Sequence, residues 1–91
     1  MKTNPSEVFI LNRIDTLNSG NKSRGATLEA ILTNIDQQHG LYVVNTINNL
    51  KKIGVLETIG QASSIGYRLT GNCEGASEEV KHYVRHRTIP D

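Results

Sequence analysis

The stretch that decides the fold is INNLKKIGVL, which runs from Ile47 to Leu56. Its apolar residues Ile47 and Leu50, together with Val43 before them, recur at the spacing i, i+4 and i+7 of one helix face. Gly54 then stands where the end of a helix favours a left-handed residue, and β-prone residues follow it. The stretch therefore predicts a helix over residues 41–53 that ends sharply and passes into a strand.

A second helix is expected just upstream. Thr27 can act as its N-cap, and its apolar residues share one face at i, i+3, i+4 and i+7: Leu28, Ile31, Leu32 and Ile35. Residues 37–40 break this period and form a turn, in which Gly40 can adopt a backbone conformation that other residues resist. Two helices joined by a tight turn are therefore predicted.

A hairpin and a last helix are expected downstream. Residues 55–59 and 65–69 are short β-prone runs joined by a polar loop at 60–64. Ser77 is a good N-cap for a terminal helix with acidic residues in its first turn and basic residues in its last. This helix has one narrow stripe, made of Ala76, Val80, Tyr83, Val84 and the stem of Arg87. Both a contact with a second copy and packing within the chain are consistent with this stripe.

The N-terminal segment predicts one more helix, over residues 5–18. Asn4 is expected to cap it and Pro5 to occupy its first position, where no N–H is needed. Its apolar stripe consists of Ile10, Leu11, Ile14 and Leu17. Val8 and Phe9 widen the apolar surface beyond one face, and we expect some of this surface to meet a partner.

Length and charge restrict the class of protein. A chain of 91 residues is predicted to be a single domain over residues 1–91, with a small aliphatic core that a partner subunit would supplement, so we expect a homodimer. The formal net charge of +1 argues against a strongly basic nucleic-acid coat, so any DNA contact must use local charge. The single cysteine, Cys73, cannot form an internal disulfide. No apolar run approaches the length of a membrane span, and none follows a charged segment as in a signal peptide. A soluble, cytoplasmic protein without membrane contact is expected.

Taken in order, these helices and the hairpin resemble the winged helix-turn-helix superfamily of DNA-binding proteins, over residues 5–71. Residues 47–56 look like the end of a recognition helix that runs into the first wing strand, and the segment 67–70 (YRLT) looks like the closing strand. The resemblance implies a winged helix core with three helices and a two-stranded wing hairpin. With the C-terminal helix that the residue pattern predicts at 76–88, a candidate dimerisation element, the expected fold is α+β, mainly α. It also implies a small DNA-binding regulator of prokaryotic, phage or plasmid type.

One face of the helix at 41–53 is rich in side-chain amides. At about 100° per residue, four polar residues project opposite its buried face: Asn45, Asn48, Asn49 and Lys52. Asn can pair bidentately with adenine N6 and N7 in the major groove, and Lys51 and Lys52 can bind phosphates as point charges. Leu41 and Tyr42 also lie toward this face, where an apolar side chain touches a thymine methyl or marks a protein contact. Base readout is the preferred interpretation, and an ordinary solvated face is the alternative.

Further cations near this helix are few. Lys22 and Arg24 in the loop at 19–25, and Arg68 beside the wing, are expected to neutralise DNA phosphates. The wing tip at residues 61–64 carries no Lys or Arg, so its insertion into a minor groove is not expected.

Signals for chemistry are weak elsewhere in the chain. Glu78, His82 and His86 recur at i, i+4 and i+8, a spacing that can hold a divalent metal, but the neighbouring Glu79 and Lys81 favour a solvated face. The sequence contains no nucleophile elbow and no phosphate-binding glycine loop. We therefore expect no catalytic residues, no metal and no cofactor.

Two classes of function remain. The preferred one is a transcriptional regulator that binds double-stranded DNA sequence-specifically as a homodimer, with the helix at 41–53 in the major groove. A plasmid or phage partition protein, which binds centromere-like repeats, would use the same device. The rival is a winged helix that serves as a protein-protein interaction module, which the near-neutral charge, the uncharged wing tip and Leu41 favour.

Overall fold

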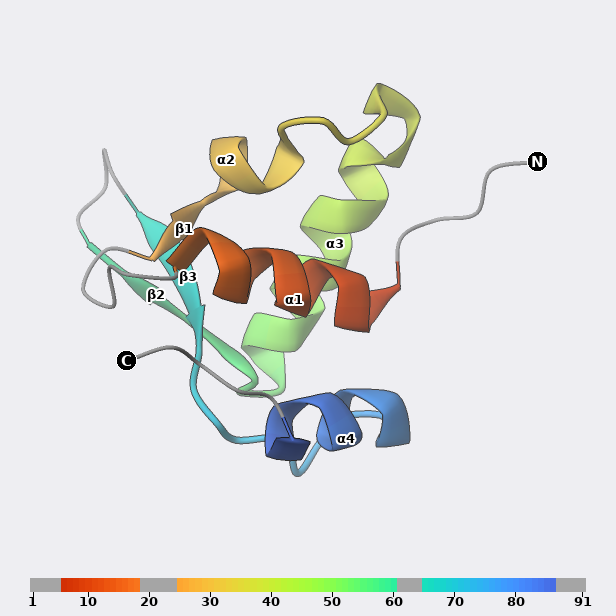
Figure 1. Cartoon of the computed structure of the whole chain (residues 1–91), viewed down its shortest axis with the longest axis vertical. Coiled ribbons are helices and arrows are strands. Elements are labelled where there is room, and N and C mark those ends of the chain that lie inside the picture. Colours follow the sequence, from red (N-terminus) through yellow and green to blue (C-terminus); the bar gives the residue numbers. More distant parts are fainter. Residues whose placement is uncertain (1–5, 19–24, 61–64, 87–91) are drawn as a thin grey trace.

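The computed structural model describes residues 6–18, 25–60 and 65–86 of the chain (Figure 1). The elements follow in the order α1 (Glu7–Asn18), β1 (Ala26–Thr27), α2 (Leu28–Leu32), the 3-10 turn η1 (Gln37–His39), α3 (Gly40–Lys52), β2 (Leu56–Ile59), β3 (Gly66–Leu69) and α4 (Glu78–His86). The expected α+β, mainly helical class is confirmed. Within the described ranges, no helix has the length and apolar content that a membrane crossing requires. Asn4, Pro5, Arg87 and the predicted wing tip at 61–64 lie outside these ranges.

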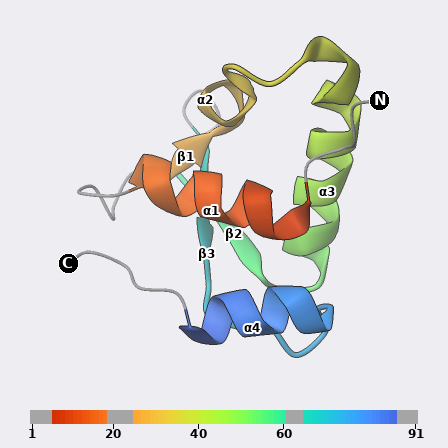
Figure 2. The same ribbon diagram turned by 45° about the vertical axis from the view of Figure 1, so that its right-hand side comes forward.

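The elements surround α1, which lies across the middle of the molecule (Figures 1 and 2). The sheet and α2 lie toward the C-terminal end of α1, and α4 lies beneath it. In Figure 2 α3 runs along the right-hand edge of the described structure, with α1, α2 and the sheet to its left, whereas in Figure 1 α1 crosses in front of its lower half. One long side of α3 is therefore turned away from the other elements.

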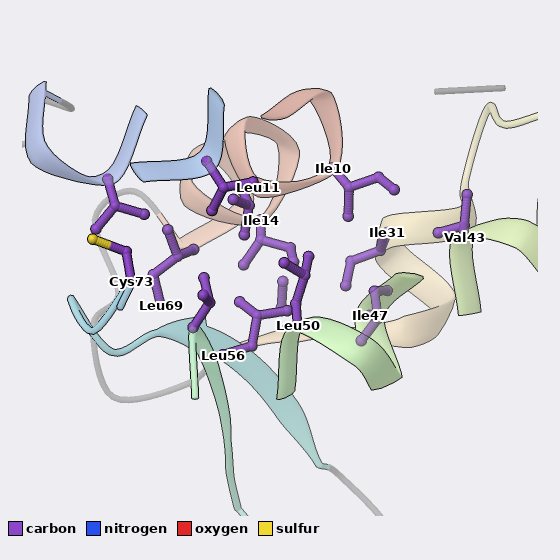
Figure 3. Packing of buried hydrophobic residues seen from close by; sticks show 14 residues of the cluster. Ile10, Leu11, Ile14, Ile31, Val43, Ile47, Leu50, Leu56, Leu69 and Cys73 are labelled. Carbon is purple, nitrogen blue, oxygen red and sulfur yellow. The ribbon is translucent and has the colours of Figure 1, made fainter. Parts of the chain in front are cut away.

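One cluster of buried apolar side chains joins these elements (Figure 3). Its largest members on the helices are fully or almost fully buried: Ile10, Leu11 and Ile14 of α1, Ile31 of α2, and Val43, Ile47 and Leu50 of α3. The strands contribute Leu56 and Leu69, and Cys73 lies on the side of the cluster near α4. Burying a large aliphatic side chain contributes about 1.5–3 kcal/mol, so these periodic apolar positions carry the stability of the fold.

The apolar stripe of α4 packs within the chain. Val80 and Val84 are part of the core cluster, and the hydroxyl of the half-buried Tyr83 donates to Oδ2 of Asp15 on α1 at 2.7 Å. Ser77 is the N-cap, as predicted, and its Oγ accepts the backbone N–H of Val80 at 3.4 Å. Of the two uses that the sequence allows for the α4 stripe, contact with a second copy or packing within the chain, the structure shows packing within the chain. A role for the rest of the predicted 76–88 helix in dimerisation stays a prediction.

The start of α1 differs from the prediction. The Ser6 hydroxyl accepts the N–H of Phe9 at 3.0 Å, and the Ser6 carbonyl accepts the N–H of Ile10 at 3.1 Å. The described helix consequently begins at Glu7, after the start that the sequence predicts at residue 5. Ser is as effective an N-cap as Asn, so the local sequence offered two competing starts.

The second helix is capped as predicted but is shorter. The Thr27 hydroxyl accepts the N–H of Ala30 at 3.2 Å, and α2 then ends at Leu32 instead of continuing through Ile35. Asn34 adopts a left-handed conformation with φ of 67°, which Asn tolerates better than most residues. The predicted apolar face nevertheless contacts the core, because Leu28, Leu32 and Ile35 all pack against the buried cluster.

Arg13 of α1 caps the C-terminal end of α2. Its Nε donates to the carbonyl of Ile31 at 2.7 Å, and its Nη2 donates to the carbonyls of Ala30 and Thr33. The last carbonyls of a helix lack partners within the helix, and the guanidinium supplies them here. Because this cap comes from another helix, it also fixes α1 against α2.

The connection to α3 shows one error and one success of the sequence reasoning. Gly40 is right-handed, with φ of −57° and ψ of −47°, and it is the first residue of α3, so its expected special conformation is wrong. At the other end Gly54 has φ of 90° and donates to the carbonyl of Lys51 at 3.1 Å, while Val55 donates to the carbonyl of Leu50 at 2.9 Å. This pair of bonds is a Schellman cap, so the predicted left-handed end of the helix is confirmed.

The predicted hairpin forms, and a short strand joins it. In the described residues the strand order is β1-β3-β2, all antiparallel, with Leu56 opposite Leu69 and Ala26 opposite Tyr67. Gly25, with φ of 67°, leads into β1, and a Cβ there would lie 2.9 Å from the carbonyl carbon of Gly66. Strand β1 is too short to carry an alternating pattern, so the two-stranded wing that was expected is one part of a three-stranded sheet.

Candidate nucleic-acid interface

Burial of the inner face of α3 determines which of its side chains face solvent. Val43, Ile47 and Leu50 are each no more than 1% exposed. Thr46 is also buried, and its hydroxyl donates to the carbonyl of Tyr42 at 2.8 Å, so it adds no unpaired polar group to the core. The opposite side of the helix bears the side chains that the projection predicted, and all are exposed: Asn45, Asn48, Asn49 and Lys52.

The two apolar residues predicted to lie toward this face behave differently. Leu41 is 72% exposed, which is the largest exposure of any large hydrophobic side chain among the described residues. Tyr42 is half-buried and packs against the core cluster, so most of its ring does not belong to the outer face. Exposure of most of a leucine side chain leaves apolar surface in water, and contact with an apolar partner group would remove that surface.

The exposed face extends beyond the start of α3, which sequence reasoning missed. The turn η1 runs directly into α3, and Gln37 and Gln38 within it are exposed. In a 3-10 turn residues i and i+3 eclipse each other, so Gln38 lies above Leu41 whereas Gln37 lies above Gly40. Gln38 therefore continues the line through Leu41 and Asn45. The spacing of these three residues was visible in the sequence, but residues 37–40 were interpreted as a break.

Two lysines mark the other end of α3. Lys51 and Lys52 are exposed and occupy the last turn of the helix. Cations at this end interact favourably with the helix dipole, so both residues also stabilise α3 itself. From Asn45 to Lys52 the rise along the axis is about 10 Å, which separates the amide-rich part of the face from its charged part.

Arg68 is held by an ion pair across the hairpin. Its Nε donates to Oε1 of Glu57, its direct neighbour across β2 and β3, and both side chains are a little under half exposed. An exposed pair of this kind contributes about 0.2–1 kcal/mol, so a phosphate could displace the carboxylate at small cost. The other two predicted phosphate contacts, Lys22 and Arg24, lie outside the described residues.

The histidines of α4 form a pair rather than a three-residue site. The rings of His82 and His86 have centroids 4.3 Å apart, and Nδ1 of His86 lies 2.9 Å from the carbonyl of His82. Glu78, the third residue of the predicted spacing, lies 3.7 Å from the Lys81 ammonium. Across the part of the chain that the structure describes, no three His, Cys, Asp or Glu side chains gather as metal ligands.

Comparison with known proteins adds no further information on the site. No protein-family model, no curated protein and no solved structure matches the chain. The interpretation of the exposed α3 face therefore rests on its residues and their geometry.

Proposed function

We propose that the chain is a winged helix-turn-helix domain that binds double-stranded DNA sequence-specifically as a small transcriptional regulator. The observation that carries this proposal is the exposed face of α3, where Asn45, Asn48 and Asn49 are open to solvent. The opposite face of the helix is buried in the core. The major groove is wide enough to admit an α-helix, and Asn is suited to the edge of adenine.

The arrangement of elements supports the same interpretation. Helices α2 and α3 are joined by a short connection, and the hairpin of β2 and β3 follows α3 directly. In a helix-turn-helix the second helix enters the groove and the first crosses the backbone. In Figure 2 one side of α3 faces away from α1, α2 and the sheet, which is the placement that a helix needs to enter the major groove.

Asn has a low helix propensity, so an exposed helix face without a binding role is not expected to be rich in it. Its propensity is about half a kcal/mol worse than that of Ala at each helix position. Three asparagines within residues 45–49 therefore weaken α3 by about 1.5 kcal/mol, which a role in base readout would explain.

The proposed molecule acts as a homodimer in the cytoplasm. Two copies would place two α3 helices on successive turns of one side of the duplex, so that each half-site adds to the affinity. Phe9 and Leu17 on α1 are 51% and 40% exposed and offer apolar surface for the second copy. Sedimentation equilibrium of the chain and of Phe9→Ser tests this assembly. A monomeric native chain would contradict it.

A second candidate, a protein-protein interaction module, is favoured by one observation. Leu41 is 72% exposed at the start of the same face, and such an apolar side chain suits a hydrophobic partner as well as a thymine methyl. The near-neutral charge of the chain is also compatible with a protein partner.

Binding to duplex DNA over a range of salt concentrations separates the two candidates. Fluorescence anisotropy with a labelled random duplex should show binding at low salt and a steep loss of affinity as salt rises. Absence of binding at low salt would exclude the DNA-binding function and leave the interaction module.

Two variants then test the role of the α3 face, once a preferred site has been selected. Asn48→Ala should relax preference at one base position, whereas Lys52→Ala should weaken binding to all duplexes similarly. Asn12→Ala, an exposed asparagine on α1, is the matched control. Equal loss on every sequence for Asn48→Ala would contradict its assigned role.

The partition alternative makes a different prediction about the bound DNA. An operator is a single site or a short palindrome, whereas a centromere-like target is a repeated array. Footprinting on the DNA upstream of the protein's own gene distinguishes one protected site from a periodic ladder.

A further inference from the structure

We infer that α3 reads A·T base pairs, through a line of side chains that begins at Gln38, in the turn η1 that leads into the helix. This inference rests on the proposed function and adds the chemical class of the DNA site. The line consists of exposed residues at successive spacings of three and four: Gln38, Leu41, Asn45 and Asn48, and Lys52 continues it toward the duplex backbone.

The geometry of the connection places Gln38 on this line. Asp36 precedes η1, and its carbonyl accepts the N–H of His39, the last residue of η1, at 2.9 Å. The next residue, Gly40, has right-handed helical geometry. The turn and α3 therefore form one nearly continuous helical surface. Gln38 lies above Leu41, and Asn45 follows one turn later, so the three side chains span about 10 Å, or about three base-pair steps.

The chemistry of the line selects one kind of base pair. Gln and Asn amides each offer a donor and an acceptor, which match N7 and N6 of adenine. Leu41, between Gln38 and Asn45, offers an apolar surface of the kind that contacts the thymine methyl. Guanine is usually read by arginine or lysine; the segment from Gln37 to Lys52 contains no arginine, and its two lysines, Lys51 and Lys52, stand at its far end.

The lysines do not supply a guanine reader at the same place. If the start of the helix enters the groove, Lys51 and Lys52 lie about 10 Å beyond Asn45 along the axis, toward the backbone of the duplex. The part of the face that meets base edges is then composed of amides and one leucine.

The experiment selects sites from a duplex library with a randomised centre, using the full chain, and sequences the enriched DNA. We expect a core rich in A·T pairs. Enrichment of G·C-rich cores, or no base preference, would overturn this inference while leaving the proposed function in place. Failure to bind any duplex at low salt would instead overturn the proposed function itself.

Base analogues in the selected site test the groove and the residues. Replacing an adenine with 7-deazaadenine removes N7 from the major-groove edge only, and it should weaken binding by about fivefold or more at a position read by an amide. Replacing a thymine with uracil removes the methyl group and should weaken binding by about fourfold at the position read by Leu41. Insensitivity to every such replacement would mean that A·T preference arises from groove shape, and it would overturn the inference.

Variants connect each effect to its side chain. In Gln38→Ala the 7-deazaadenine effect at one position should disappear, and in Leu41→Ala the uracil effect should disappear. Gln37→Ala is the matched control, because Gln37 is also exposed but lies above Gly40, off the line. Retention of the full 7-deazaadenine effect at every position in Gln38→Ala would remove Gln38 from the recognition surface. Thermal melting of each variant, which should match the native chain because these side chains are exposed, verifies folding.

Discussion

The two lysines in the last turn of α3 give the sharpest quantitative test of how the chain would bind DNA. Each phosphate contact adds about −0.9 to the slope of log affinity against log salt concentration. If Lys51 and Lys52 each neutralise one phosphate, the double variant Lys51→Ala/Lys52→Ala should have a slope less negative by about 1.8 for each bound subunit. Raising salt from about 50 to about 200 mM should then cost the native subunit about 12-fold more affinity than it costs the variant.

The measurement is fluorescence anisotropy with one labelled duplex at several salt concentrations. The matched control is Lys81→Ala/Arg85→Ala on α4, which lowers the net charge by the same amount on a different helix. The control should lower affinity slightly and leave the slope nearly unchanged. An equal change of slope in both double variants would show that net charge alone is responsible, and an unchanged slope in the α3 variant would refute the placement of α3 on DNA.

Three further predictions concern single substitutions. Glu57→Gln removes the carboxylate that holds Arg68, so affinity for all duplexes should rise by about threefold at low salt; titration against a random duplex measures this, and unchanged affinity would place Arg68 away from the DNA. Gly54→Ala places a Cβ on a residue with φ of 90°, which should lower the free energy of unfolding by about 1 kcal/mol in urea denaturation; no loss of stability would contradict the strained cap. Tyr83→Phe removes the 2.7 Å hydrogen bond to Asp15, which should cost about 1 kcal/mol in the same assay, and an unchanged urea midpoint would show that the bond adds nothing to stability.

Periodicity predicted the long elements because it reports burial directly. The pattern of Val43, Ile47 and Leu50 identified both the inner face of α3 and, by subtraction, its outer face of amides and Lys52. The Schellman cap at Gly54 was also predictable, since it depends on the conformational freedom of one residue and on bonds within six positions of the chain.

Local sequence patterns did not predict the features of the backbone that depend on residues distant in the sequence. Arg13 caps α2 from another helix, and the absence of a Cβ at Gly25 permits the close approach to Gly66 beside strand β1. Gly40 was expected to adopt a special conformation, yet Asn34 is the left-handed residue of this connection. This error affected the candidate site: because residues 37–40 were predicted to be a break between the helices, Gln38 was not included in the exposed face of α3.

The sequence by itself determined which residues are apolar and at what period, and hence the helices, the hairpin and the exposed amides of α3. Only the tertiary structure decided that Tyr42 turns toward the core, that Arg68 pairs with Glu57 and that the stripe of α4 is used inside the chain. The physical reason is the range of the interactions. Local patterns set the direction in which each side chain points, while its partner depends on segments that only folding brings together.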